Sequence, residues 1–197
     1  MADTYPLGLI LCGGKSSRMN GQNKALVDFD GQPLLQRIKL RLQPQVRRIL
    51  LNLAEDSDEY RSFGLDICLD IKPDSGPLVG LASAFQMTNA EQDIFICPCD
   101  APFVPIDLVR CMSAVMAKEN ADIVCPKYAG EPQPTFALWH RKTAAIVVES
   151  VTKGIGGLKA LYPELVVATI DWPESEPNPF FNINTPEELS LALKFVE

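Results

Sequence analysis

The residues best suited to chemistry stand near the start of the chain, where an aliphatic run leads into a loop rich in glycine, serine and cations, Leu9–Lys24 (LILCGGKSSRMNGQNK). The adjacent Gly13 and Gly14 suit a sharp turn whose backbone N–H groups approach a ligand closely, and successive N–H groups of this kind bind anions. Arg18 and Lys24 add positive charge suited to phosphate oxygens. The stretch indicates a polyphosphate site, and the alternative is a glycine turn whose basic residues are merely solvated.

Two well-known glycine-loop motifs do not fit this stretch. The dinucleotide fingerprint G-x-G-x-x-G and the P-loop G-x-x-x-x-G-K-[ST] both need separated glycines, whereas Gly13 and Gly14 are adjacent. The ordered pattern of strand, G-G-x-S-x-R-M, Lys24 and then Gly31–Leu35 (GQPLL) resembles the nucleotidyltransferases that activate a phosphate-bearing acceptor with a nucleoside triphosphate. Among them, LxGGxSxRM followed by N-K is similar to the molybdenum cofactor guanylyltransferases of the MobA type.

A second candidate is Asp100, in the segment Pro98–Pro102 (PCDAP) that follows an apolar run. A carboxylate at the end of a buried strand can hold Mg²⁺, which prefers oxygen ligands and is typically bound by one or two carboxylates plus substrate phosphates. In isolation, an aspartate there is more often a turn former or a helix cap. The P-C-D-x-P pattern matches the metal-binding motif of the guanylyltransferases, so the resemblance implies that Asp100 holds Mg²⁺.

Two further polar residues, Asn52 and Asp70, also stand where predicted strands end. Each can accept hydrogen bonds from guanine N–H groups or ribose hydroxyls. Alternatively, Asn52 simply terminates its strand, and Asp70 caps the helix that follows or pairs with Lys72. The resemblance implies a GTP site made of Leu11, Cys12, Gly13, Gly14, Lys24, Asn52, Asp70 and Asp100, with Lys24, Arg18 and Asp100 as the catalytic residues. Cys12 departs from the alanine that the family more often has.

Asn182 and Asn184, in the segment NINTPEE, match a family motif near the acceptor site. The equally plain alternative is a polar turn between a strand and a helix. Cys97 and Cys99 form a lone C-x-C pair without a second cysteine pair, so they are expected to be buried structural thiols.

The elements that must position these residues alternate between strand and helix. Short apolar runs predict strands at Leu7–Leu11, Arg48–Leu53, Leu65–Leu69 and Asp93–Cys97, and helices are predicted over 34–42, 56–63 and 78–88. This alternation favours a three-layer, doubly wound, Rossmann-like α/β fold with a mainly parallel mixed sheet; the resemblance implies the nucleotide-diphospho-sugar transferase type. In such sheets ligands bind outside the carboxyl ends of the strands, so the glycine pair, Asn52, Asp70 and Asp100 should share one cleft.

The second half is less regular. It predicts strands at Ile123–Pro126, Thr135–Trp139 and Leu165–Ile170, the first two forming an antiparallel hairpin, with helices over 106–119, 143–151 and 157–161. Thr185, Pro186 and Glu188 have the N-cap, N1 and capping-box pattern that opens a final helix.

Length and composition favour one domain over residues 1–197, with the GTP and magnesium site in about residues 1–103 and the acceptor side in about 104–197. A net charge of −7 argues against nucleic-acid binding, and no apolar run approaches a membrane span. The N-terminus lacks a secretory pattern, so we expect a cytoplasmic protein with six reduced cysteines. The single histidine, His140, argues against a histidine metal site or a Ser-His-Asp triad.

The resemblance implies transfer of GMP from Mg-GTP to the phosphate of molybdopterin or Mo-molybdopterin, with release of pyrophosphate. It also implies contact with proteins that deliver molybdopterin or serve as molybdoenzyme chaperones. One alternative is a cytidylyltransferase of the same fold acting on molybdopterin or a sugar or polyol phosphate, against which the Gly13–Gly14 pair argues, since relatives that use CTP tend to read A-A-G or A-G there. The other is a non-catalytic molybdopterin or nucleotide carrier.

Overall fold

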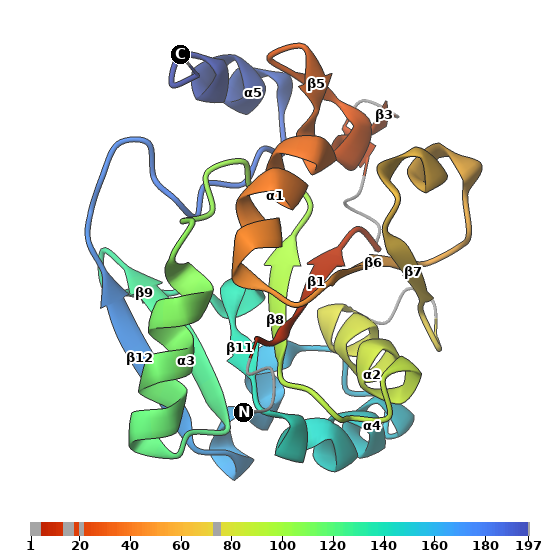
Figure 1. Cartoon of the computed structure of the whole chain (residues 1–197), viewed down its shortest axis with the longest axis vertical. Helices are drawn as coiled ribbons and strands as arrows, with labels where there is room; N and C mark the ends of the chain where they lie inside the picture. Colours follow the sequence, from red (N-terminus) through yellow and green to blue (C-terminus); the bar gives the residue numbers. More distant parts are fainter. Residues whose placement is uncertain (1–4, 14–17, 20–21, 73–75, 197) are drawn as a thin grey trace.

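A computed structural model describes residues 5–13, 18–19, 22–72 and 76–196, with only the backbone of 18, 19 and 22. The described strands form an eight-stranded mixed sheet in the order β10-β9-β11-β8-β1-β6-β7, with β12 paired to β9. Helices cover both faces of this sheet (Figure 1). The predicted three-layer, mainly parallel α/β fold is therefore confirmed.

The centre of the sheet is the parallel group predicted from the first hundred residues. It consists of β1 (Leu7–Leu11), β6 (Ile49–Leu53), β7 (Asp66–Leu69) and β8 (Ile94–Pro98). In the register, Leu11 at the end of β1 lies opposite Asn52 on one side and Pro98 on the other. The carboxyl ends of these strands therefore bring the candidate residues to one edge of the sheet.

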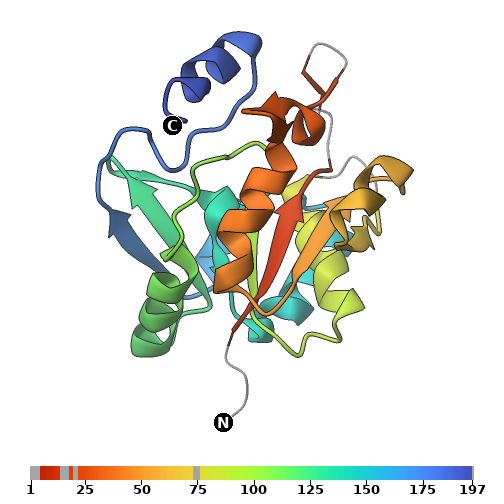
Figure 2. The same cartoon turned by 45° about the horizontal axis from the view of Figure 1, so that its top comes forward.

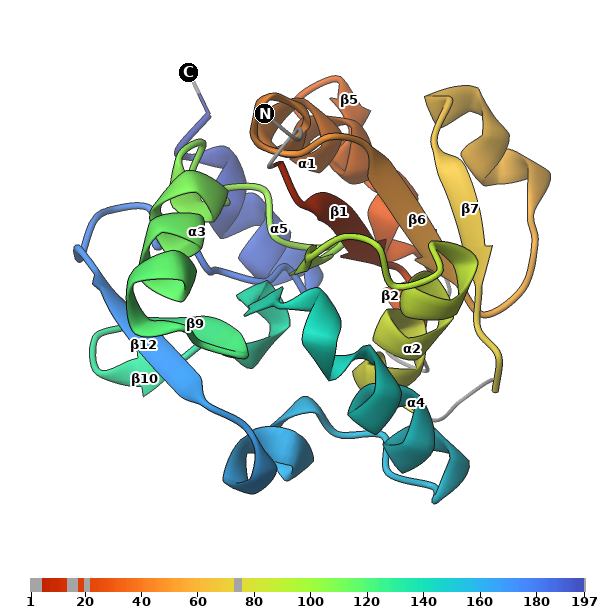
Figure 3. The same cartoon turned by 60° about the horizontal axis from the view of Figure 1, so that its bottom comes forward.

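The α-helices α1 (Leu34–Leu42) and α3 (Leu108–Glu119) lie on the opposite face of the sheet from α2 (Pro77–Met87) and α4 (Ala144–Thr152), as Figure 3 shows. In α1 the buried side chains are Leu34, Leu35, Ile38 and Leu42, which is the spacing of a single helical stripe. The buried apolar residues form two clusters, one under each helical layer.

The predicted antiparallel pairing of the two strands in the second half is confirmed, but their bounds and the connection between them differ from the predicted hairpin. β9 (Ile123–Tyr128) turns through Ala129 and Gly130, both with positive φ, into the short antiparallel β10 (Glu131–Pro132). The predicted strand at Thr135–Trp139 is wrong over its first part, because Pro134–Phe136 forms a 3-10 helix, η4, and only β11 (Leu138–Trp139) is extended. Pro132 and Pro134 lack the N–H groups that a longer ladder needs. β11 lies antiparallel between β8 and β9, and β12 (Val167–Trp172) is parallel to β9.

Two predicted helices are 3-10 helices in the structure: η3 (Asp58–Phe63) and η6 (Leu158–Glu164). Gly64, in the left-handed conformation, ends η3 after two turns, and Pro163 lies inside η6, where its ring disfavours α-helical bonding. The remaining short elements are β2 (Arg18–Met19), β3 (Gln22–Asn23), η1 (Lys24–Leu26), β4 (Asp28–Phe29), β5 (Gln32–Pro33), η2 (Gln43–Gln45) and η5 (Arg141–Thr143). Among the described residues, no helix is long and apolar enough to cross a membrane.

The chain ends in α5 (Pro186–Leu193), on the side of the sheet where β1 and β8 end (Figures 1 and 2). The predicted capping box is present: Thr185 Oγ1 accepts from the N–H of Glu188 at 3.2 Å, and Glu188 Oε2 accepts from the N–H of Thr185 at 3.0 Å. The segment before this helix is bonded to the end of β8, because the N–H of Ile183 donates to the carbonyl of Asp100 at 2.8 Å. This contact brings Asn182 and Asn184 to the edge of the sheet that carries Asp100.

Candidate nucleotide and metal site

Lys24 lies at the centre of the polar residues that the structure brings together. Its ammonium donates to Asn184 Oδ1 at 2.6 Å and lies 3.4 Å from Asp100 Oδ2. The side chains of Lys24 and Asp100 are 6% and 14% exposed, so this ion pair is largely shielded from solvent. In this arrangement the Lys24 ammonium can bind phosphate oxygens, and the Asp100 carboxylate can bind a metal cation.

Two oxygens in this group have no hydrogen-bond partner within the described part of the chain. They are Oδ1 of Asp100 and Oδ1 of Asn182, and both are buried. Buried polar atoms are normally paired, and an unpaired oxygen is a common sign of an ion or ligand that completes the site. One carboxylate and one amide oxygen are the hard ligands that Mg²⁺ accepts together with water and phosphate oxygens. The residues present therefore fit a divalent cation at Asp100, and Asn182 offers a second oxygen from the segment that is bonded to Asp100.

Burial raises the pKa of Asp100 above its ordinary value, because the surrounding protein disfavours the charged carboxylate. The adjacent Lys24 ammonium opposes this shift by Coulomb attraction and hydrogen bonding. The net direction is upward, so the carboxylate holds a proton more tightly than an exposed aspartate does. A bound cation would compete with that proton.

Asn52 and Asp70 form a direct pair at the ends of β6 and β7. The buried Asn52 amide donates from Nδ2 to Asp70 Oδ1 at 2.9 Å and to the carbonyl of Cys68 at 3.1 Å. The Asn52 Nδ2 group is thus used inside the protein and Oδ1 remains its acceptor, so the expectation that both residues accept hydrogen bonds from guanine stays a prediction. The alternatives of a plain strand end for Asn52 and a helix cap for Asp70 do not account for this contact.

Two glycines allow the Asn52–Asp70 pair to form. A Cβ on Gly13 would lie 3.0 Å from Asp70 Oδ2, and a Cβ on Gly80 would lie 2.3 Å from Asn52 Oδ1. The second distance is far below van der Waals contact, so Asn52 could not keep its position beside an alanine at 80. The sequence analysis missed Gly80, because an isolated glycine in a helix gives no sign of which side chain approaches it.

The structure describes only some of the other predicted site residues. Leu11 ends β1 half-buried and Cys12 follows it, buried, with its N–H donating to the carbonyl of Asn52 at 3.0 Å. Gly14 lies outside the described residues. Arg18 is described only by its backbone, which pairs with Asn23 in a small hairpin, so the predicted role of its side chain stays a prediction.

The loop after Asp100 is held by side chains of α1 and η2 that the sequence analysis did not single out. Arg37 Nε donates to the carbonyl of Pro102 at 3.3 Å, and Arg41 Nε donates to that of Val104 at 2.6 Å. Gln45 Nε2 donates to the carbonyl of Pro105 at 2.8 Å. Residues 37, 41 and 45 are spaced by four, so they lie on one face, and only their i, i+4 spacing could have suggested a common role.

All six cysteines are free thiols in the structure, and Cys12, Cys97 and Cys99 are buried. Burial is the main cause that raises the pKa of the Cys12 and Cys97 thiols well above the ordinary value. Thiols of this kind stay protonated and unreactive.

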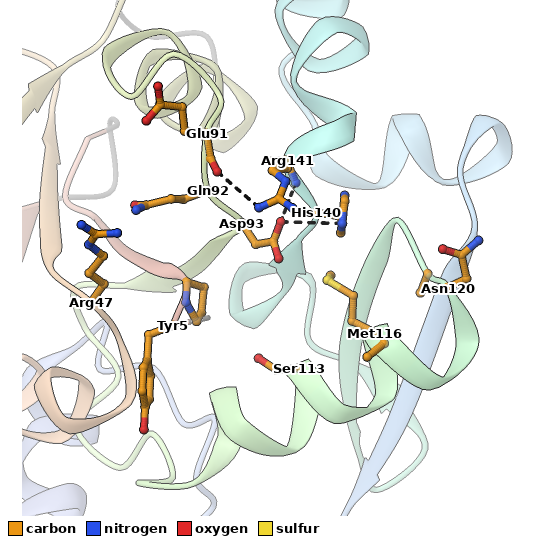
Figure 4. A pocket seen from close by; sticks show the side chains of 13 residues that line it. Tyr5, Arg47, Glu91, Gln92, Asp93, Ser113, Met116, Asn120, His140 and Arg141 are labelled. Carbon is orange, nitrogen blue, oxygen red and sulfur yellow. Dashed lines mark hydrogen bonds and ion pairs between the residues drawn. The ribbon is translucent and has the colours of Figure 1, made fainter. Parts of the chain in front are cut away.

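A separate pocket of about 540 Å³ lies at the opposite end of the sheet (Figure 4). Asp93, which precedes β8, accepts there from the backbone N–H of Arg141 at 2.9 Å and lies 3.9 Å from His140 Nε2. None of the predicted site residues lines this pocket. The candidate chemistry therefore belongs to the carboxyl edge of the sheet.

Comparison with known proteins agrees with this geometry. The family model described as "MobA-like NTP transferase domain" matches residues 8–168. A Vibrio campbellii protein named molybdenum cofactor guanylyltransferase is 36% identical over 184 residues, which are 92% of this chain and 92% of that protein.

Solved structures share the fold. The crystal structure of molybdopterin-guanine dinucleotide biosynthesis protein A from Archaeoglobus fulgidus matches with a TM-score of 0.78 at 21% identity, over 95% of this chain and 97% of that one. Rv0371c from Mycobacterium tuberculosis, solved in complex with manganese, matches with a TM-score of 0.70 at 16% identity, over 98% of this chain and all of that one. Both the sequence match and the shared architecture extend over most of the molecule, and the chain belongs to the MobA-like NTP transferase family.

Proposed function

We propose that this protein is a molybdenum cofactor guanylyltransferase that transfers GMP from GTP to the phosphate of Mo-molybdopterin, releasing pyrophosphate. The observation that carries the proposal is the polar group of the buried Lys24 with Asp100, Asn182 and Asn184 at the carboxyl edge of the sheet, together with the Asn52–Asp70 pair. It occurs in a chain 36% identical over 92% of its length to a protein with that name.

The residues suit in-line attack by a phosphate nucleophile on the α-phosphorus of GTP. No side chain needs to form a covalent intermediate, because the acceptor phosphate is already a nucleophile, so catalysis rests on alignment and charge neutralisation. Lys24 would bind the triphosphate oxygens, and the N–H groups near Gly13 would add further donors. Asn184 holds the Lys24 ammonium in place for this role.

Asp100 and Asn182 would hold Mg²⁺ through their unpaired oxygens. When bound, the ion neutralises charge that develops on the phosphates. Because burial raises the pKa of Asp100, protons compete with the cation for this carboxylate at higher pH than they would at an exposed aspartate.

Recognition of guanine would fall to Asp70. A carboxylate can accept two hydrogen bonds from the N1–H and 2-amino groups of guanine, which cytosine and adenine cannot offer in the same arrangement. Asn52 fixes the direction of this carboxylate through its 2.9 Å bond.

Incubation of the protein with Mg-GTP and a molybdopterin source tests the proposal. We expect release of pyrophosphate together with a guanine dinucleotide of molybdopterin. Binding of both ligands without pyrophosphate release would indicate a carrier, and equal turnover of CTP would indicate a cytidylyltransferase. In either case the guanylyltransferase assignment would be lost.

A further inference from the structure

A buried hydroxyl lies directly beneath the candidate site. It belongs to Tyr60 of η3, a residue only 4% exposed and packed in the core on the α1 side of the sheet. Tyr60 OH accepts a hydrogen bond from Nδ2 of Asn23. The two residues are 37 positions apart, so the contact joins η3 to the segment that carries Lys24.

Asn23 is the residue that sets the backbone at Lys24. Its Oδ1 accepts from the N–H of Ala25 at 3.2 Å and so caps η1, which begins at Lys24. The same amide thus fixes the turn through one end and contacts Tyr60 through the other. With its amide anchored in this way, Asn23 directs the Lys24 side chain inward, toward Asn184 and Asp100.

Two cysteine thiols, from the segments that follow β1 and β8, lie near the Tyr60 hydroxyl. The thiols of Cys12 and Cys99 lie close enough to act electrostatically on the Tyr60 phenol, although burial is the largest cause that raises its pKa. Cys12 precedes Gly13, and Cys99 precedes Asp100. Tyr60 therefore lies where three segments meet, and each segment presents a candidate site residue at its next position.

We propose that Tyr60 is a positioning residue for nucleotidyl transfer: its hydroxyl fixes the Asn23 amide, and Asn23 in turn fixes the Lys24 ammonium that receives the triphosphate. This inference rests on the proposed function of the same site. Tyr60 touches no substrate in this arrangement, because its side chain is buried. Loss of the hydroxyl alone should loosen Lys24 while the ring continues to fill the core.

The test compares Tyr60→Phe with Tyr162→Phe. Tyr162 has a buried hydroxyl that makes no hydrogen bond to any described residue, although the Cys125 thiol lies near it, and its ring packs on the opposite face of the sheet. We expect Tyr60→Phe to weaken Mg-GTP binding about 3- to 10-fold by calorimetry, the effect of one lost hydrogen bond. Guanosine, which has no phosphates, should bind both variants and the wild type equally. Tyr162→Phe should leave GTP binding unchanged.

A double-mutant cycle separates positioning from general weakening. If Tyr60 acts through Lys24, Tyr60→Phe should cause no further loss of GTP affinity in a Lys24→Ala background. Asn23→Ala provides a second variant outside the core, and it should reproduce the loss for GTP and spare guanosine.

Three outcomes would overturn the inference. They are unchanged GTP affinity in Tyr60→Phe, an equal loss in the Lys24→Ala background, or a parallel loss of guanosine binding. Failure of the proposed function would look different, because the wild-type protein itself would then neither bind GTP nor release pyrophosphate.

Discussion

At the scale of single residues, the candidate metal position has one carboxylate, Asp100, with asparagine neighbours. The described residues hold no group of three or more His, Cys, Asp or Glu side chains suited to a metal. One carboxylate with amide oxygens binds a cation weakly on its own, so phosphate oxygens of the substrate must complete the coordination. Metal and nucleotide are therefore expected to bind together.

This arrangement predicts different consequences for two substitutions. Asp100→Asn is nearly isosteric but lacks the charge that holds Mg²⁺, so the variant should fold, keep much of its nucleotide affinity and lose transfer. Lys24→Ala removes a cation that already attracts the triphosphate in the ground state, so GTP affinity should fall about 10- to 100-fold along with turnover. The measurements are GTP binding, magnesium dependence and GMP transfer for both variants. A fully active, magnesium-dependent Asp100→Asn enzyme would remove Asp100 from the metal site.

The raised pKa of Asp100 predicts how the magnesium requirement of transfer changes at acidic pH. Cation binding needs the carboxylate, so the magnesium concentration required for half-maximal transfer should rise about tenfold per pH unit below this pKa. The rise should begin above the ordinary aspartate value of 3.8. Titration of transfer rate against magnesium at several pH values measures it.

The same shift affects stability with the opposite sign. Because the pKa is higher in the folded than in the unfolded state, protonation of Asp100 stabilises the nucleotide-free protein, and this contribution is lost as pH rises through the folded pKa. Relative to Asp100→Asn, the wild type should gain melting temperature on acidification through that window. A constant difference between the two proteins would contradict the assignment of the shift.

Gly80→Ala should disturb guanine recognition without touching a substrate. The new Cβ would lie 2.3 Å from Asn52 Oδ1, so Asn52 must move and its bond to Asp70 must lengthen. We expect GTP affinity and the preference for GTP over ATP both to decrease, even though alanine is the better helix former by about 1 kcal/mol. Gly157→Ala is the control, because a Cβ there meets nothing within 4 Å.

At the scale of elements, α1 and η2 hold the loop that follows Asp100, in addition to covering the sheet. Arg37 and Arg41 of α1 and Gln45 of η2 bind three carbonyls of the loop that follows Asp100. Gln45 also caps α3 from outside, since its Oε1 accepts from the N–H of Val109 at 3.0 Å and the local N-cap Asp107 makes no side-chain cap bond. The amphipathic α1 and the 3-10 helix η2 that follows it thus position both the loop after Asp100 and the next helix.

We therefore expect Gln45→Ala to lower the free energy of unfolding more than the replacement of a polar residue usually does. It would leave the buried N–H of Val109 and the carbonyl of Pro105 without their present partners, which should lower the free energy of unfolding by about 2–3 kcal/mol. Gln43→Ala, at an exposed position of the same 3-10 helix, should change it by less than about 0.5 kcal/mol. Denaturant unfolding of the two variants provides the comparison, and equal stability would show that Gln45 does not cap α3.

At the scale of the whole molecule, residues near both ends of the chain come together in the candidate site. Lys24 and Asn184, which are 160 positions apart, meet at 2.6 Å. The C-terminal segment therefore contributes to the candidate phosphate and metal site, in addition to the acceptor role that its motif suggests. Ligand binding should couple the two halves of the chain.

Mg-GTP should accordingly stabilise the whole protein. A ligand present at 100 times its Kd adds about 2.7 kcal/mol to the free energy of unfolding. Mg-CTP and Mg-ATP at the same concentration should produce a clearly smaller rise in melting temperature, because they lack the guanine N–H donors from which Asp70 is proposed to accept. Equal shifts with CTP would remove the guanine assignment while leaving the fold intact.

The sequence by itself determined the central strands, α1, α2 and the capped final helix, because each has a local signature of period, burial or capping. It also predicted that the Gly13–Gly14 pair, Asn52, Asp70 and Asp100 lie at one edge of the sheet, because parallel strands share their carboxyl end. Local patterns overestimated regularity where proline or a left-handed glycine intervenes, as in η3, η4 and η6.

Only the tertiary structure decided how these residues pair. The direction of the Asn52 amide, the bond between Lys24 and Asn184, the capping of α3 by Gln45 and the contact of Tyr60 with Asn23 all join positions far apart in the chain. Periodicity reports which side of an element is buried, whereas a side-chain partner depends on which elements the packed core brings together. Residue types are enough to predict the chemistry of the site, whereas the positions of its groups depend on these long-range contacts.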